Sequence, residues 1–280
     1  PVIRSEYQLY DDLKRIDIKN TVQKEETLDK EGVYFAFPFQ SENPDFSYQI
    51  QNGWLKPNED QLPGAAREWF TTQNLVHLKD SDYSIGWATP DAPLFTLTDI
   101  NRGEWPQHLE INNGHLFSYV MNNYWFTNYK AGQGGEFEFN YSITGGTNLS
   151  SEELSHFDAD IRKPVLGYAL QSSWSASVEA EDRPLPPEKG SFMDLGSSNL
   201  QFITFKKAED GQGYILRFRE TSGKTGETTM TFPLFRLTEV HLANGVEENK
   251  TELEPDGNSV VVPYDANNYT TVRLNVQSNL

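Results

Sequence analysis

The chain has 280 residues, enough for one large all-β domain or for two domains of unequal size. Its formal net charge of −18 repels nucleic-acid phosphates and anionic lipid head groups, so neither nucleic acid nor a membrane surface is expected as a partner. The sequence contains no cysteine, which excludes disulfides, thiolate metal sites and cysteine nucleophiles.

Aromatic residues make up 13% of the chain, so burial depends strongly on Phe, Tyr and Trp, which favour strands over helices. No apolar run approaches the roughly 18 residues that span a bilayer, and the first residues lack the apolar stretch of a signal peptide. A soluble protein is expected, and the sequence leaves its compartment open.

Short strand patterns separated by turn residues recur along the chain, as in antiparallel sandwiches. Strands are predicted at 32–39, 115–129, 135–143 and 213–220. The segment 135–143 alternates apolar and polar residues, with Phe137, Phe139 and Tyr141 on one side and Glu138 and Asn140 on the other. Such alternation is typical of a strand with one face in the core and one in water.

One helix is predicted, at 150–163. Ser150 or Ser151 can cap its first turn, acidic residues follow within that turn, and Pro164 ends the helix. A single short helix leaves the class all-β.

Prolines, glycines and charged residues gather at 179–199, which opposes regular structure and predicts a connection there. Several short strand patterns follow, each bounded by Gly, Asn or Pro. The sequence therefore predicts a large domain at 1–198 and a smaller β-sandwich at 199–280.

Aromatic and amide side chains are interleaved in MNNYWFTNY, residues 121–129. As a strand, this segment places Asn123 and Trp125 on one face and Asn122 and Asn128 on the other, so neither face is purely apolar. Amides beside flat aromatic rings suit the hydroxyls and the C–H face of a sugar, and these four residues are candidate carbohydrate contacts. In the alternative interpretation, the amides satisfy backbone groups at a strand end while the aromatics pack inside.

Acidic residues and one arginine lie at turns in residues 86–105. Loops on a rigid β scaffold often carry function, so Asp99 and Arg102 are further candidate contacts. Asp91, within Pro-Asp-Ala-Pro, is equally a turn-forming residue.

The sequence shows none of the common catalytic or metal-binding motifs. The five histidines never fall at the spacing of a metal pair, and no phosphate-binding glycine loop or nucleophile elbow occurs. The glycines at 132–135 are typical of a hairpin turn. Carboxylates are too numerous for a glycosidase pair to be selected from their spacing.

Several phrases in a fixed order resemble the C-terminal β region of glycoside hydrolase family 38, the α-mannosidase family. The resemblance covers most of the chain, and the ordered set is more specific than any single phrase. The phrases are YFAFPF at 34–39, DQLPGAAREWF at 60–70, GWATPDAPLF at 86–95, MNNYWFTNY at 121–129, FKKAEDGQGYILRFRETSG at 205–223, LTEVHLANG at 237–245 and YTTVRLNV at 269–276.

The resemblance implies a large β-supersandwich, similar to galactose mutarotase, followed by a small β-sandwich. In that family a zinc-bearing catalytic barrel and a helical bundle precede the β domains, and the barrel holds the Asp nucleophile. Those segments have no counterpart in this chain, so we assign no catalytic residue, no metal ligand and no cofactor to it. The aromatic and amide motif and the loop at Arg102 are expected at the rim of the barrel pocket.

Three hypotheses follow. The chain is the β portion of an α-mannosidase-like retaining glycosidase, inactive alone, whose partners are the barrel, the helical bundle and mannose-containing glycans. Alternatively, it is a free-standing carbohydrate-binding module. The third possibility, compatible with the first, is a structural scaffold with an exposed apolar patch where the barrel would dock.

Overall fold

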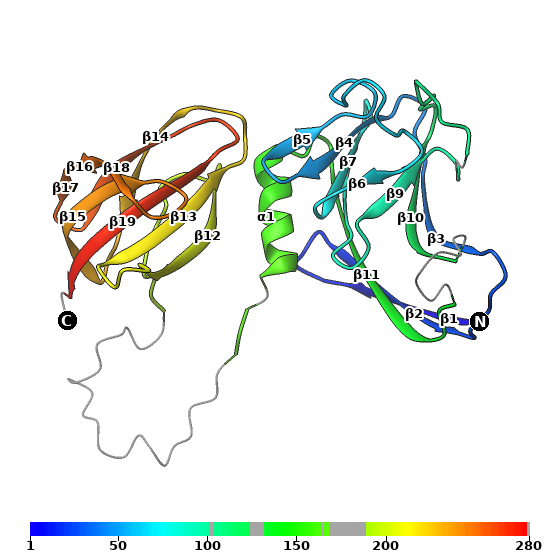
Figure 1. Ribbon diagram of the computed structural model, residues 1–280, viewed down its shortest axis with the longest axis horizontal. Helices are drawn as coiled ribbons and strands as arrows, with labels where there is room; N and C mark the ends of the chain where they lie inside the picture. Colours follow the sequence, from blue (N-terminus) through cyan, green and yellow to red (C-terminus); the bar gives the residue numbers. More distant parts are fainter. Residues whose placement is uncertain (101–102, 124–131, 164, 168–188, 279–280) are drawn as a thin grey trace, which may run out of the picture. The chain divides into compact units, whose positions relative to one another are not determined.

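The computed structural model describes residues 1–100, 103–123, 132–163, 165–167 and 189–278 (Figure 1). These residues form antiparallel sheets with a single helix, which confirms the predicted all-β sandwich class. The chain divides into two compact units, Pro1–Arg162 and Lys163–Leu280. The predicted boundary after residue 198 stays a prediction. In the described part of the chain, no helix has the length and apolarity needed to cross a membrane.

The first unit contains a seven-stranded sheet in the order β1-β2-β11-β8-β7-β4-β5. Every neighbouring pair in it is antiparallel. Its strands are β1 (Val2–Leu9), β2 (Ile16–Lys24), β11 (Gly135–Gly146), β8 (Ser84–Ala88), β7 (Leu75–Lys79), β4 (Asp45–Ile50) and β5 (Gly53–Leu55).

A four-stranded sheet packs on it, in the order β3-β10-β9-β6. Its strands are β3 (Gly32–Phe39), β10 (Gly114–Asn122), β9 (Leu94–Leu97) and β6 (Phe70–Thr71). The core between the two sheets is aromatic: Phe37 makes edge contacts with Trp87 and Tyr141, whose ring centroids lie 5.2 and 4.9 Å away. Edge-to-face packing of this kind is the preferred geometry of buried rings.

The strands predicted from alternation are found. Residues 32–39 form β3, 135–143 lie within β11, and 213–220 contain β13 (Tyr214–Glu220). Phe139 and Tyr141 are buried while Glu138 is exposed, as the period-two pattern predicts. Of the strand predicted at 115–129, residues up to Asn122 belong to β10, and 124–131 lie outside the described residues.

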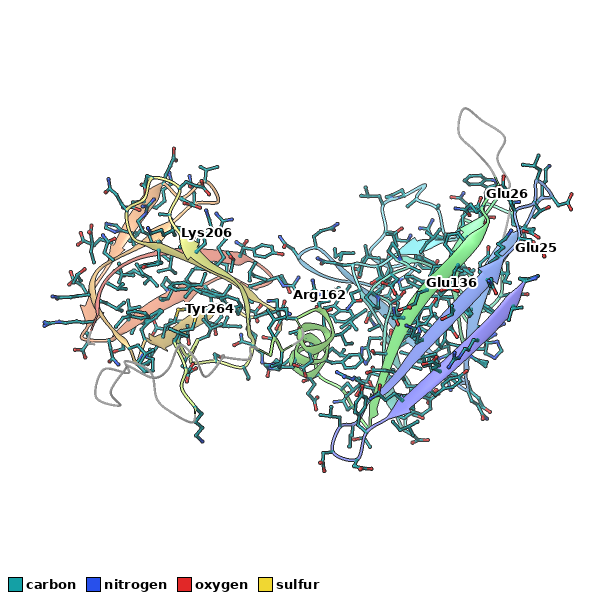
Figure 2. The ribbon with its side chains drawn as sticks, turned by 90° about the horizontal axis from the view of Figure 1, so that it is seen from below. Glu25, Glu26, Glu136, Arg162, Lys206 and Tyr264 are labelled. Atoms are coloured by element: carbon teal, nitrogen blue, oxygen red, sulfur yellow. The ribbon has the colours of Figure 1, made fainter. Side chains whose placement is uncertain are left out.

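The seven-stranded sheet extends beyond the four-stranded sheet at β1. Strands β1, β2 and β11 lie side by side there (Figure 2). Ile3 pairs with Val22, a core residue, so the face of β1 that carries Ile3, Tyr7 and Leu9 continues the core side of the sheet. These three side chains are nevertheless 55%, 65% and 71% exposed. An apolar strip of the inner face is therefore uncovered, and we call Ile3, Tyr7 and Leu9 the β1 strip.

The helix α1 (Ser151–Arg162) confirms the predicted helix and covers the other face of the sheet. Ser150 and Glu153 form a capping box: the Ser150 hydroxyl accepts the Glu153 N–H, and the Glu153 carboxylate accepts the Ser150 N–H. Buried Asp158 fixes the helix to the sheet by accepting hydrogen bonds from Gln49 and Asn74. Gly86 permits the close approach, since a Cβ there would lie 2.7 Å from Leu154.

The second unit is a sandwich of a five-stranded and a three-stranded sheet, with orders β12-β13-β19-β15-β16 and β14-β18-β17. Phe218 and Leu274 of the larger sheet meet Met230 and Val262 of the smaller one in a fully buried core. The strands are β12 (Leu200–Lys207), β13, β14 (Gly226–Thr231), β15 (Phe235–Ala243), β16 (Asn249–Leu253), β17 (Pro255–Asp256), β18 (Ser259–Tyr264) and β19 (Tyr269–Ser278). Of the connection predicted at 179–199, residues 179–188 lie outside the described part.

Candidate functional site

Two neighbouring amides of the 121–129 motif have different environments. Asn123 is buried, and its side chain binds backbone: it accepts the Glu31 N–H at 2.7 Å and donates to the carbonyls of Thr27 and Asp29. These bonds join the end of β10 to the segment before β3. They match the alternative interpretation, in which the amides satisfy backbone groups at a strand end. Asn122 is exposed at the last position of β10, opposite Gly32. A sugar-contact role for these amides stays a prediction.

Among the other predicted contacts, Asp99 is the one that lies within the described residues. Trp125, Asn128 and Arg102 lie outside the described residues. Asp99 is exposed in the turn after β9, where its carboxylate accepts the Ile100 N–H. The neighbouring Thr98 N–H binds the carbonyl of His115, near the start of β10. The length of β10 therefore separates Asp99 from Asn122, by roughly 23 Å at the usual strand rise.

Asp91 has a structural contact. Its carboxylate accepts two hydrogen bonds from Asn140, from the backbone N–H at 2.7 Å and from the side-chain amide at 2.9 Å. The Pro-Asp-Ala-Pro turn is thereby attached to β11, in keeping with the turn-forming interpretation.

Three aromatic rings stack on the outer face of the four-stranded sheet. Tyr34 and Tyr119 are directly opposite each other on β3 and β10, and their rings are nearly parallel with centroids 4.3 Å apart. Trp69 continues the stack, 6.1 Å from Tyr119. Their neighbours Phe35 and Phe70 point into the core, so period-two alternation places the stack outside. Trp87, in contrast to Trp69, is buried in the core between the two sheets.

The segment before β6 carries buried polar groups beside this stack. Glu68 is fully buried, and its Oε1 accepts the backbone N–H groups of Glu104 and Trp105 at 2.6 and 3.1 Å. Among the described residues, no hydrogen-bond partner is found for Glu68 Oε2, Arg67 Nε, Trp69 Nε1 or the Tyr34 hydroxyl. Buried polar atoms are normally hydrogen-bonded, and these four have no such bond within the described residues.

Trp105 is one of the two residues whose backbone N–H groups bind Glu68. Its backbone has φ of +50°, a left-handed conformation that is unfavourable for a bulky residue, and its side chain is 69% exposed. The two hydrogen bonds to Glu68 hold the backbone at this point. An exposed indole offers a flat apolar surface and one N–H donor. We call Tyr34, Glu68, Trp69, Trp105 and Tyr119 the outer-sheet site.

The sequence did not reveal the outer-sheet site because its parts are far apart along the chain. Glu68 and the amides that it binds are separated by 36 and 37 residues. The available signal was a repeated Glu-Trp pair, at 68–69 and 104–105, with a glycine before the second pair.

The described residues do not fit a metal ion. Nowhere in that part of the chain do three His, Asp or Glu side chains come together as potential ligands. A zinc ion of the kind expected in the family barrel therefore has no donor set among them.

Comparisons with known proteins agree with the fold. Residues 199–277 match the model of the glycosyl hydrolases family 38 C-terminal beta sandwich domain. The fold of 98% of the chain is similar to that of an alpha-mannosidase from Enterococcus faecalis V583, with a TM-score of 0.68 and 12% identity. A glycosyl hydrolase family 38 protein from Enterococcus faecalis gives a TM-score of 0.66 over 98% of the chain, with 13% identity.

No curated protein matches the sequence. The chain spans only 29% and 30% of the two solved proteins, and at these identities the similarity shows the fold alone. The family match confirms the predicted resemblance for the phrases at 205–223, 237–245 and 269–276: residues 199–277 are similar to the glycosyl hydrolases family 38 C-terminal beta sandwich domain.

Proposed function

We propose that the chain is the C-terminal β portion of an α-mannosidase-like glycoside hydrolase and that it supports and lines a catalytic barrel outside this sequence. The match at 199–277 supports the family part of this proposal. The similar fold of 98% of the chain, over only 29% of a solved alpha-mannosidase, supports the role of one portion of a larger enzyme.

The observation that carries the supporting role is the β1 strip. A scaffold that covers another domain is expected to expose an apolar patch at the contact. Ile3, Tyr7 and Leu9 form such a patch on the core side of the sheet, where the four-stranded sheet does not reach. We infer that the barrel or the helical bundle covers this strip.

The proposal places the chemistry outside this chain. Retaining hydrolysis requires two carboxyl groups about 5 Å apart on either side of the scissile bond. Zinc would bind to ligands of the barrel. The outer-sheet site and Asn122 would contribute to the rim of the pocket by binding sugar hydroxyls and ring faces.

Hydrolysis of an aryl α-mannoside tests the proposal. The chain alone should release no aryl alcohol, whereas the longer polypeptide from the same gene should hydrolyse the substrate and lose activity in a metal chelator. Turnover by the chain alone, or a longer polypeptide without mannosidase activity, would contradict the proposal.

The contact itself is tested in the longer polypeptide. Replacing both Tyr7 and Leu9 with serine should lower its melting temperature but leave the melting temperature of the isolated chain nearly unchanged. Glu227→Gln, an exposed change on β14, is the matched control. Equal effects on both proteins would show that the β1 strip contacts nothing outside the chain.

A free-standing carbohydrate-binding module is the second candidate, favoured by exposed Trp105 in the outer-sheet site. Titration with methyl α-mannoside should then change the tryptophan fluorescence of the chain, and Trp105→Ala should abolish the change. Phe192→Ala, which removes another exposed aromatic ring in the second unit, is the control. An unchanged signal at millimolar sugar would remove this candidate.

A further inference from the structure

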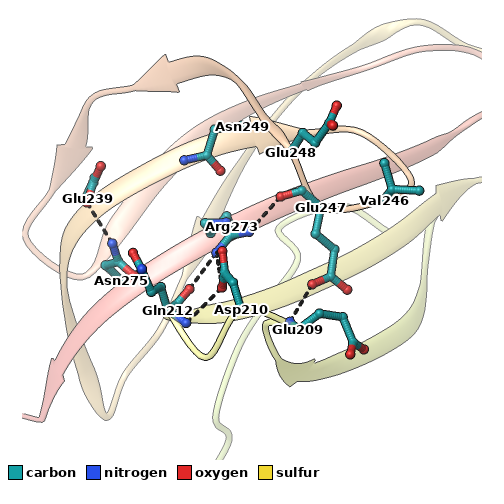
Figure 3. A pocket seen from close by; sticks show the side chains of 10 residues that line it. All are labelled: Glu209, Asp210, Gln212, Glu239, Val246, Glu247, Glu248, Asn249, Arg273 and Asn275. Atoms are coloured by element: carbon teal, nitrogen blue, oxygen red, sulfur yellow. Dashed lines mark hydrogen bonds and ion pairs between the residues drawn. The ribbon is translucent and has the colours of Figure 1, made fainter.

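A pocket of about 410 Å³ opens on the second unit (Figure 3). Residues of the turns at 208–213 and 244–248 line it together with side chains of β15 and β19. Its volume lies within the usual range of about 300 to 1,000 Å³ for small-molecule sites. Nothing in the proposed function uses this pocket.

Arg273, like Glu247, is a buried charged side chain of this pocket. It is only 8% exposed, and its Nη1 donates to both carboxylate oxygens of Asp210 and to the Gln212 carbonyl at 2.7 Å. Its Nη2 donates to the Glu247 carbonyl at 2.7 Å. The Nε is buried and has no partner within the described residues. The four hydrogen bonds fix the guanidinium and hold the Asp210 carboxylate beside it.

The carboxylates around Arg273 are already compensated. Asp210 pairs with Arg273, and Glu247 pairs with Lys206 at 2.7 Å. These interactions hold the pKa of both carboxyl groups below their ordinary values. No three acidic side chains of the described chain form a metal-ligand group. The pocket therefore favours a neutral ligand with hydroxyl groups over a free cation.

The rim of the pocket adds side chains that suit such a ligand. Glu239 accepts a hydrogen bond from Asn275 at 2.7 Å and keeps lone pairs for a hydroxyl donor. Asn249 carries an amide above Arg273 (Figure 3), and Val246 presents an exposed apolar surface. Carboxylate acceptors, amide donors and an apolar contact together match the hydroxyls and the C–H face of a sugar ring.

We propose that this pocket binds a pyranose ring of a neutral carbohydrate. Asn249 donates to its hydroxyl groups, Asp210 and Glu239 accept from them, and Val246 contacts the C–H face. The site is separate from the outer-sheet site and independent of the mannosidase proposal, because it is tested by binding and not by hydrolysis.

Amide NMR of the full chain tests the site by titration with methyl α-mannoside and methyl β-galactoside. At least one of the two sugars should cause saturable shifts at the backbone amides of Gln212, Val246 and Asn249, with millimolar affinity. Asn249→Ala and Glu239→Ala should each weaken binding about fivefold, the loss of one hydrogen bond. Glu227→Gln, which removes an exposed carboxylate outside the pocket, should leave the affinity unchanged.

Three results would overturn the inference. Neither sugar shifts the pocket amides, both pocket variants bind as the parent does, or calcium or spermidine causes the shifts while the sugars do not. The last result would identify a cation site. None of these outcomes affects the result expected of the hydrolysis test, so either proposal can be wrong while the other holds.

Discussion

Glu220 in the second unit and Glu68 in the first are both buried glutamates, with exposed fractions of 1% and 0%. Glu220 accepts hydrogen bonds through both oxygens, from Asn199, Ser222, Gly223 and Asn267. Glu68 uses Oε1 for two backbone amides, whereas Oε2 has no partner in the described chain. Within the described residues, both oxygens of Glu220 therefore accept hydrogen bonds, whereas only one oxygen of Glu68 does.

The two units also differ in how completely they bury their apolar surface. In the second unit, the core residues of the five-stranded sheet face those of the three-stranded sheet. In the first unit, the seven-stranded sheet continues its apolar side to β1 without a covering strand. The comparison shows that the second unit buries the apolar faces of both of its sheets, whereas the first unit leaves apolar side chains of β1 exposed.

The largest expected effect is in the closed core of the second unit. Phe218→Ala should lower the free energy of unfolding by about 4 kcal/mol, because it removes a fully buried ring and leaves a cavity. Urea unfolding monitored by amide hydrogen exchange should locate the loss of stability in the second unit. Phe202→Ala, a change of a partly exposed ring in the same sheet, should cost less than about 1 kcal/mol. Equal losses would show that the core is not closed as described.

Glu220→Gln should have the next largest effect and should depend on pH. Burial raises the pKa of Glu220, but hydrogen bonds from Ser222, Asn267 and Asn199 outweigh it and lower the pKa to about 2. Because the folded-state pKa lies below the ordinary 4.5, the stabilisation is full above about pH 4.5 and is lost as the pH falls toward 2. Its size is roughly 3 kcal/mol.

Urea unfolding of the parent and Glu220→Gln between pH 7 and 2.5 measures this contribution. The difference between the two should shrink as the pH falls through 4.5, and Glu227→Gln should show no such trend. A difference that is constant with pH would contradict the assignment of the low pKa to Glu220.

Glu68→Gln should cost less than Glu220→Gln, about 1 kcal/mol. The amide oxygen can still accept both backbone N–H groups, and Oε2 has no partner in the described chain to lose. Thermal unfolding measures the effect, with Glu104→Gln, an exposed change in the loop whose backbone N–H groups Glu68 binds, as control. A loss as large as that of Glu220→Gln would show that Glu68 is fully satisfied.

The smallest expected effect is at β1. Tyr7→Ser in the isolated chain should change the stability by no more than about 0.5 kcal/mol, because the side chain is largely exposed. Tyr141→Ser, on the same side of the same sheet but buried, should cost several times more. Urea unfolding compares the two, and similar losses would indicate that the β1 strip is covered within the chain.

The sequence predicted the local features of the fold well, because each depends on residues that are close together. The alternation around Phe139 and the capping box of Ser150 and Glu153 are complete within a few positions. The candidate site was harder to predict. Asn123 binds the Glu31 amide from 92 positions away, and period-two alternation does not reveal such a bond. Likewise, Arg273 is buried because the turn at 244–248 folds over it, which its own strand pattern does not indicate.

The β1 strip also affects how the chain is expected to fold and associate in a cell. β1 lies at the edge of its sheet, so one side of its backbone has no neighbouring strand among the described residues, and apolar side chains of β1 are exposed there. Free strand edges with apolar surface promote association between chains, and transiently exposed apolar surface is a reason that chaperones exist. Produced by itself, the chain should therefore depend on chaperones and self-associate through β1 as its concentration rises.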